Sequence, residues 1–244
     1  MLKDTKEFPG FDKFSNFLEV YINRLRLKQE INSVLDLGGG ANPMLSKKKY
    51  NLKFYDLADI SIKELKKADP KKYSHFYCVD LTSDVSKINK KYDLVFSHMF
   101  LEHIKDADSL HRNIAKLLRV KGIAIHLYPS HYNFPLFLNR ILPECLSELL
   151  LKIVQPHRYK GDKHLKFPAF YKRCGPPSSS LEIYFNERGF EILEHIGFVG
   201  HDYYARFGFL AFIEKEIRKI LLFFKIPMIS YNVLILRKLH SKSI

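Results

Sequence analysis

The stretch SVLDLGGGANP, residues 33–43, constrains the fold of this chain more than any other feature. Residues 34–37 form a short apolar run that predicts a buried strand, with Asp36 close to its end. Three glycines follow at once: Gly38, Gly39 and Gly40. Glycine tolerates positive φ and lets a ligand approach the backbone, and Asn42 and Pro43 suit the start of a helix. Strand, tight turn and helix start together predict a ligand site at the carboxyl end of a strand in an open α/β sheet.

Apolar segments and helical patterns alternate along the rest of the chain, which is typical of parallel sheets with helical crossovers. The predicted strands are residues 34–37, 52–57, 75–81, 92–97, 123–128, 190–200 and 230–239. The predicted helices are residues 12–30, a short helix after the glycine turn, 108–119 and 178–188. The chain is therefore expected to be α/β, a Rossmann-like seven-stranded, mostly parallel sheet with helices on both faces.

Two segments interrupt this rhythm within an expected single domain of residues 1–244. Residues 129–177 follow the fifth strand and are expected to form a helical cap over the ligand edge, which is the edge of the sheet where the parallel strands have their carboxyl ends. Their basic, aromatic stretch 158–173 is either a determinant of acceptor specificity or a solvated surface loop. Residues 203–226 are expected to form a helical insertion before the last strand. Its apolar face favours packing or a homodimer contact first, and an interfacial helix on anionic lipid second.

Composition narrows the classes of partner and compartment. The formal charge of +14 attracts phosphates, but its lysines are scattered and no nucleic-acid-binding motif accompanies them. An anionic small molecule or an anionic membrane surface explains the charge equally well. The three cysteines form no CxxC pair, and the first residues lack the apolar core of a signal peptide. We therefore expect a cytoplasmic protein, with a peripheral position at the inner face of the membrane as an alternative.

Acids recur at the predicted strand ends. Asp56 lies twenty residues after Asp36, the spacing at which nucleotide-binding α/β folds place an acid against ribose. A carboxylate suits this place because it accepts two vicinal O–H donors at once. Asp80 can accept an adenine amino proton while its neighbour Leu81 covers the ring.

These motifs carry a family resemblance. LDLGGGANP and YDLVFSHMFLEHIKD resemble class I S-adenosylmethionine-dependent methyltransferases, in the group with a type 11 methyltransferase domain. One departure is Asn42, which stands where the common GxGxG pattern has its last glycine. The resemblance implies S-adenosylmethionine as cofactor and an antiparallel seventh strand between the fifth and sixth. The cofactor-binding residues it implies are Asp36, Gly38, Gly39, Gly40, Asp56, Leu57, Asp80, Leu81 and Ser97.

The resemblance also implies the kind of reaction. PSHYNFPLFLNRILPE is similar to an insertion in bacterial members that act on sugars, lipids or secondary metabolites. The expected acceptor is thus a small molecule, a sugar, or a lipid-linked or nucleotide-linked compound, methylated first of all at oxygen. A hydroxyl acceptor benefits from a general base, and the candidates are His103, His98 and His131.

Several alternatives stay open. His103 follows Glu102, and this pair can instead cap or orient a helix. The pair also resembles part of a metal-ligand cluster in quinone-biosynthesis O-methyltransferases, but the cluster's other acids are missing, so no metal is expected. An NAD-dependent oxidoreductase could use the same glycine turn, although GxGxxG is absent. A cofactor-binding scaffold without catalysis is the third hypothesis.

Overall fold

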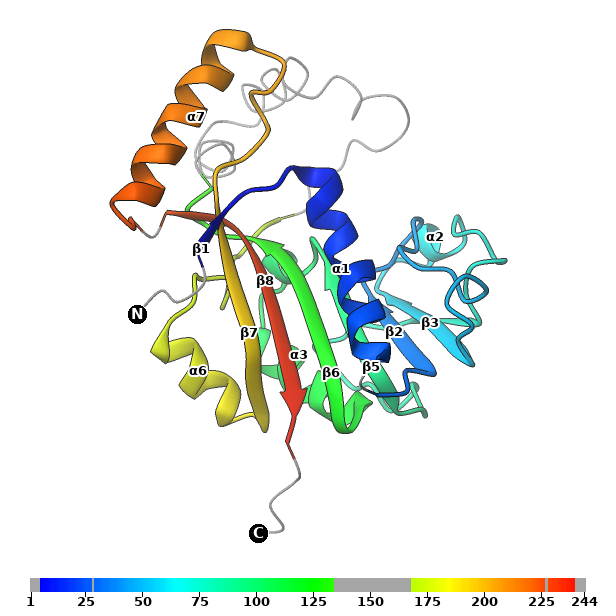
Figure 1. Ribbon diagram of the computed structural model, residues 1–244. Helices are drawn as coiled ribbons and strands as arrows, with labels where there is room; N and C mark the ends of the chain where they lie inside the picture. The colour runs from blue at the N-terminus through cyan, green and yellow to red at the C-terminus, as the bar shows by residue number, and fades with distance from the viewer. Residues whose placement is uncertain (1–4, 28, 134–167, 227, 240–244) are drawn as a thin grey trace.

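The computed structural model describes residues 5–27, 29–133, 168–226 and 228–239, which form one mixed sheet with helices on both faces (Figure 1). The strands are β1 (Thr5–Glu7), β2 (Ser33–Leu37), β3 (Phe54–Asp59), β4 (His75–Cys78), β5 (Tyr92–His98), β6 (Leu118–Pro129), β7 (Phe190–Val199) and β8 (Ile229–Lys238). The helices are α1 (Phe11–Arg26), α2 (Ile62–Leu65), the 3-10 helix η1 (Leu101–His103), α3 (Ala107–Leu117), α6 (Ser179–Asn186) and α7 (Gly208–Phe223).

The strand order is β1-β7-β8-β6-β5-β2-β3-β4. Every neighbouring pair is parallel except the two that β8 makes with β6 and β7. The predicted α/β fold is therefore confirmed, as is the antiparallel last strand between the fifth and sixth predicted strands. Within the described residues the sheet has eight strands rather than seven, because β1 pairs with the outer edge of β7. Three residues are too few to show the alternation that reveals a strand in a sequence.

The chain between β2 and β3 differs from the prediction of a short helix. Residues 38–53 form turns, held by hydrogen bonds such as those from the Leu52 N–H to the Lys47 carbonyl and from Tyr50 to Ser46. The buried side chains in this stretch are Pro43, Leu45, Tyr50 and Leu52. Their spacing does not repeat every three or four residues, so a helix would not bury them together.

Several strands also begin or end at residues other than those predicted. The second strand starts and ends two residues later, at Phe54–Asp59, and the third ends at Cys78, two residues before Asp80. The fifth strand starts at Leu118 directly after α3, where the sequence predicted that the helix continues to Arg119. These shifts matter because a two-residue change decides which acid stands at the ligand edge.

Two apolar cores lie on opposite faces of the sheet. On one face, α1 packs Phe14, Leu18 and Ile22 against strand residues that include Leu57 and Phe96. The other face is covered by α3 and α6. In Figure 1, α3 lies behind the sheet and α6 lies beside β7. Burying each such large side chain contributes about 1.5–3 kcal/mol. Because side chains alternate along a strand, each strand residue serves one face only.

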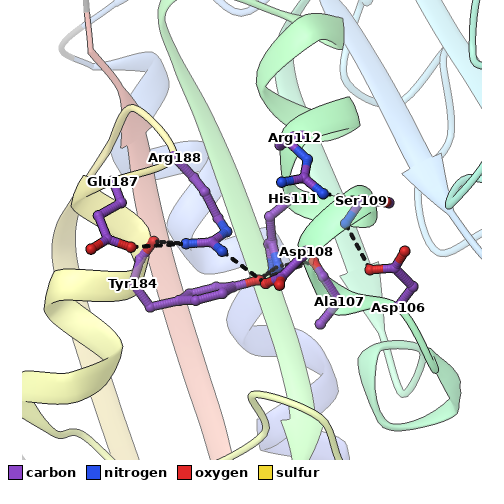
Figure 2. Close-up of polar contacts among 9 residues, drawn as sticks. All are labelled: Asp106, Ala107, Asp108, Ser109, His111, Arg112, Tyr184, Glu187 and Arg188. Carbon is purple, nitrogen blue, oxygen red and sulfur yellow. Dashed lines mark hydrogen bonds and ion pairs between the residues drawn. The ribbon is translucent and has the colours of Figure 1, made fainter.

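A polar network joins α3 to α6 on that second face (Figure 2). Arg188 binds Asp108 through Nη2 at 2.9 Å and donates through Nη1 to the Tyr184 carbonyl at 2.8 Å. The Tyr184 hydroxyl donates to the Ala107 carbonyl at 3.0 Å, and His111 Nδ1 lies 2.7 Å from the same oxygen. The network ties α6 to the first turn of α3, which Asp106 caps by accepting from the Ser109 N–H. The network thereby holds α3 and α6 together on the second face of the sheet.

The structure describes one of the two expected insertions but not most of the other. Residues 134–167 of the cap lie outside the described residues, so the cap and most of its basic loop stay predictions. The insertion at 203–226 contains α7, whose apolar face does not pack against the described part of the domain. The expected packing is therefore wrong, and the homodimer contact stays a prediction. No helix in the described ranges is both long and apolar enough to cross a membrane.

Candidate active site

The glycine turn leaves β2 in the conformation that its sequence predicts. Gly38 and Gly40 have φ of +71° and +44°, and the Gly38 N–H donates to the Ala58 carbonyl at 2.8 Å. The Phe100 ring occupies the place where a Gly38 side chain would project. At Gly39, an added Cβ would come within 2.9 Å of the Asp36 carboxyl carbon. Gly38 and Gly39 therefore have no room for a side chain, whereas at Gly40 the positive φ is what favours glycine.

Asp36 supports the turn from beneath. Its side chain is buried, and the Tyr55 hydroxyl donates to its Oδ2 at 2.7 Å. Burial raises the pKa of Asp36 to about 7, against the opposing effect of the Tyr55 hydrogen bond. The predicted position of Asp36 close to the end of the strand is confirmed, and its carboxyl lies against Gly39. The cofactor-binding role of Asp36 stays a prediction.

The acid expected against ribose is the main correction. Asp56 lies in the middle of β3 with no exposed surface, and its Oδ2 accepts from Lys90 at 3.0 Å and from the Tyr92 hydroxyl at 2.8 Å. The expectation that Asp56 stands at the ligand edge is therefore wrong. Leu57 is also buried, in the core beneath α1, so its side chain cannot cover a cofactor.

Asp59 takes the place expected for Asp56. It is the last residue of β3, and its Oδ2 lies 3.5 Å from the position of a Cβ on Gly40. Its Oδ1 accepts from the Ser61 N–H at 2.8 Å. Burial raises the pKa of Asp59, and backbone hydrogen bonds from Ser61 and Gly40 oppose that rise. The chain offers a signal for this end, because Ser61 caps α2 and a capping serine marks where the preceding strand must stop.

Asp80 lies just beyond the edge strand β4. Its Oδ1 accepts from the Thr82 N–H at 2.8 Å and from the Thr82 hydroxyl at 2.7 Å. Partial burial raises its pKa, but the hydrogen bonds from Thr82 and Ser83 outweigh burial and leave the pKa of Asp80 below its usual value. The side chain is exposed, so it can bind a ligand, whereas Leu81 is buried against the second core.

Ser97 does not reach the ligand edge with its side chain. It is fully buried on the second face, where its hydroxyl lies 2.8 Å from His126 Nδ1. The expectation of a cofactor contact from the Ser97 side chain is therefore wrong. Alternation explains the change, because the next residue, His98, turns to the opposite face.

The three candidate bases have different surroundings. His98 ends β5 on the α1 side, where its Nε2 lies 3.4 Å from the Ser15 hydroxyl. Burial lowers the pKa of His98 to about 4, so its imidazole is neutral at physiological pH. His103 Nδ1 lies 2.8 Å from the Pro168 carbonyl. His131 follows β6 and its ring lies 4.0 Å from that of Tyr132.

His103 and Glu102 bind residues 168–171 and hold them against η1. The Glu102 carbonyl accepts from the N–H groups of Phe170 and Tyr171 at 2.7 and 3.1 Å. With the His103 contact to Pro168, these bonds place residues 168–171 beside the ligand edge. This arrangement favours the orienting role for the pair over direct chemistry by His103.

Glu102 predicts a pH dependence of stability. Burial raises the pKa of its carboxyl from 4.5 to about 8. Between these values the folded chain binds more protons than the unfolded chain, so this group lowers the free energy of unfolding as pH rises. We expect Glu102→Gln to be more stable than the wild type by about 2–5 kcal/mol at pH 8, with the difference vanishing near pH 4. Urea unfolding at both pH values measures this, and a difference that does not change with pH would contradict it.

The strand order brings the best-placed groups together. β2 lies between β3 and β5, so the glycine turn is flanked by Asp59 on one side and His98 on the other. The half-buried acid, the side-chain-free turn and the exposed Asp80 fit a ligand with a ribose, a base and a polar tail that approaches the backbone closely.

Comparisons with known proteins decide the family. A family model described as a methyltransferase domain matches residues 13–195. The chain belongs to this family. It is a methyltransferase that depends on S-adenosylmethionine, and the residues at the ligand edge fit that cofactor.

Solved structures of methyltransferases share the fold at low identity. A SAM-dependent methyltransferase from Archaeoglobus fulgidus is 15% identical, with a TM-score of 0.55 over 92% of this chain and 94% of that one. Magnesium protoporphyrin IX methyltransferase from Synechocystis PCC 6803, with bound SAH, is 14% identical, with a TM-score of 0.53 over 92% and 82%. The N-methyltransferase NodS from Bradyrhizobium japonicum WM9 is 12% identical, with a TM-score of 0.51 over 94% and 99%. No curated protein matches this chain.

Proposed function

We propose that this methyltransferase acts on a hydroxyl of a small molecule, a sugar, or a lipid-linked or nucleotide-linked acceptor, with His98 as general base. The observation that supports this is the position of the His98 imidazole, at the end of β5 next to the glycine turn and 3.4 Å from the Ser15 hydroxyl. Sulfonium-bound methyl groups are already electrophilic, so the protein's task is to align the acceptor and remove its proton.

The chain's own residues divide the work of binding. Asp59 accepts the two ribose hydroxyls, Asp80 accepts from the adenine amino group, and the turn at Gly38–Gly40 lets the remaining part of the cofactor approach the backbone. α1 covers the face on which His98 lies and thereby limits water around the imidazole. The Ser15 contact to His98 is long, so an acceptor hydroxyl can replace it at Nε2.

The proposed base predicts a large kinetic effect. We expect His98→Gln to lower kcat by about 10²–10⁴-fold, the usual contribution of a positioned base, while the affinity for S-adenosylmethionine stays the same. Since the pKa of the free imidazole is about 4, the acid limb of the kcat/KM profile is expected near pH 4 rather than 6.5.

The experiment incubates the protein with isotopically labelled S-adenosylmethionine and fractionated cell extract, then locates the label by mass spectrometry. Label on an oxygen, lost with His98→Gln and retained with His131→Gln, supports the proposal. Label on nitrogen, or turnover by His98→Gln within about twofold of the wild type, contradicts it.

We place the reaction in the cytoplasm. Among the described residues Cys78 and Cys174 are free thiols, as expected in a reducing compartment. Fractionation of the source cells tests this, and recovery of the protein with oxidised cysteines from an extracellular fraction would contradict it.

A further inference from the structure

α7 turns its apolar side away from the protein. Phe209 and Phe223, near the two ends of the helix, are 76% and 81% exposed. The exposed apolar residues of the helix are Phe209, Leu210, Phe212, Ile213, Ile217, Ile220 and Phe223. Figure 1 shows the helix projecting beyond the sheet. An ordinary surface helix has the opposite arrangement, with its apolar stripe on the core.

The polar side of α7 explains this orientation. Arg218 is buried, and it binds both Glu214 carboxylate oxygens at 3.1 and 2.6 Å and donates to the His201 carbonyl at 3.1 Å. Gly200 has φ +96° and makes room for this guanidinium, because a Cβ there would collide with it. The anchor fixes the Glu214–Arg218 side toward the domain, so at 100° per residue Phe209 and Ile220 point outward.

We propose that α7 seats this protein on an anionic lipid bilayer, with its apolar face in the boundary between headgroups and acyl chains. Exposed cations flank the face: Arg206, Lys215 and Lys225. The two acids of the helix are already ion-paired, Glu214 with Arg218 and Glu216 with Lys219. Apolar side chains flanked by unneutralised lysine and arginine are complementary to a surface of anionic headgroups.

Charge and length favour lipid over other occupants. A two-fold contact between two copies of α7 would bring the same cations together, which opposes association. The helix has 16 residues, about 24 Å at 1.5 Å per residue, and carries charges, so it lies in the interface plane and does not span it. The formal charge of +14 adds attraction to the same surface.

The test is co-sedimentation of the whole protein with vesicles, without any methyl acceptor, so it is independent of the proposed reaction. One set contains phosphatidylcholine with about a third phosphatidylglycerol, and the other contains phosphatidylcholine alone. We expect binding to the anionic set and at least about tenfold weaker binding to the neutral set. Ile220→Asp is expected to lower the partition coefficient about tenfold or more. Lys215→Gln is expected to lower it about fivefold.

Ile183 on α6 provides the matched control, because it is 58% exposed and Ile220 is 53% exposed. Ile183→Asp is expected to leave vesicle binding within about twofold of the wild type. The proposal is overturned if the wild type does not sediment with anionic vesicles, or if Ile183→Asp loses binding as much as Ile220→Asp. A different outcome would assign the face to a second copy of the chain. In that case the wild type does not bind vesicles, and light scattering shows that it is a dimer which Ile220→Asp dissociates.

Discussion

Asp59→Asn is expected to weaken the binding of S-adenosylmethionine by about 5–150-fold, which corresponds to about 1–3 kcal/mol. The carboxylate at the end of β3 can accept two vicinal hydroxyls, whereas an amide offers one acceptor and turns a donor toward the other hydroxyl. The amide oxygen can still accept from the Ser61 N–H, so the turn after β3 is preserved. Isothermal titration calorimetry measures the change directly.

Asp56→Asn is the matched control, because the same chemical change is made three residues earlier in the same strand. Asp56 is buried and paired with Lys90 and Tyr92, so this variant is expected to lose about 1–3 kcal/mol of stability. Its affinity for the cofactor is expected to stay within about twofold of the wild type. Equal losses of affinity in both variants, or a loss only with Asp56→Asn, would refute the assignment of Asp59 to ribose.

Gly38→Ala is expected to lower the free energy of unfolding by about 2–4 kcal/mol. Two causes act together, since the residue has φ +71° and its new Cβ would collide with the Phe100 ring. Backbone strain in the left-handed region accounts for about 1 kcal/mol, and overpacking for about 1–3 kcal/mol. Denaturant unfolding monitored by circular dichroism measures the sum.

Variants at Gly189 and Phe100 separate the backbone strain from the steric overlap. Gly189 has φ +76° and nothing within 4 Å of an added Cβ, so Gly189→Ala measures the backbone effect alone. Phe100→Leu in the Gly38→Ala background is expected to recover part of the steric cost and none of the backbone cost. If Gly38→Ala and Gly189→Ala destabilise equally, the Phe100 ring does not press on the turn.

Local patterns determined much of the fold. The run at residues 34–37 with its three glycines predicts β2 and the positive-φ turn, because both depend on residues adjacent in the chain. The helical spacing of α1, α3 and α6 is a local property in the same way. β8 differs in this respect. Its apolar pattern predicts that a last strand exists, but its place between β6 and β7 was predicted only from the family resemblance.

Strand register limited the prediction of the site. The sequence FYDLADIS holds two acids, and spacing from Asp36 favoured the first one. A shift of two residues in β3 buried Asp56 against Lys90 and left Asp59 at the edge. Ser97 and His98 show the same limit, because alternation sends one to His126 in the core and the other to Ser15 of α1. Register depends on contacts with neighbouring strands, which a pattern within one strand does not contain.

The sequence by itself therefore determined the family, the cofactor and the glycine turn, because these depend on short contiguous motifs. Only the tertiary structure decided which acid stands at the end of β3, which histidine lies beside the glycine turn, and which side of α7 faces outward. Each of these depends on partners distant in the chain: Lys90 for Asp56, Ser15 for His98, and His201 with Gly200 for Arg218. Burial and pairing set the charge and direction of a side chain, and both arise only when the chain has folded.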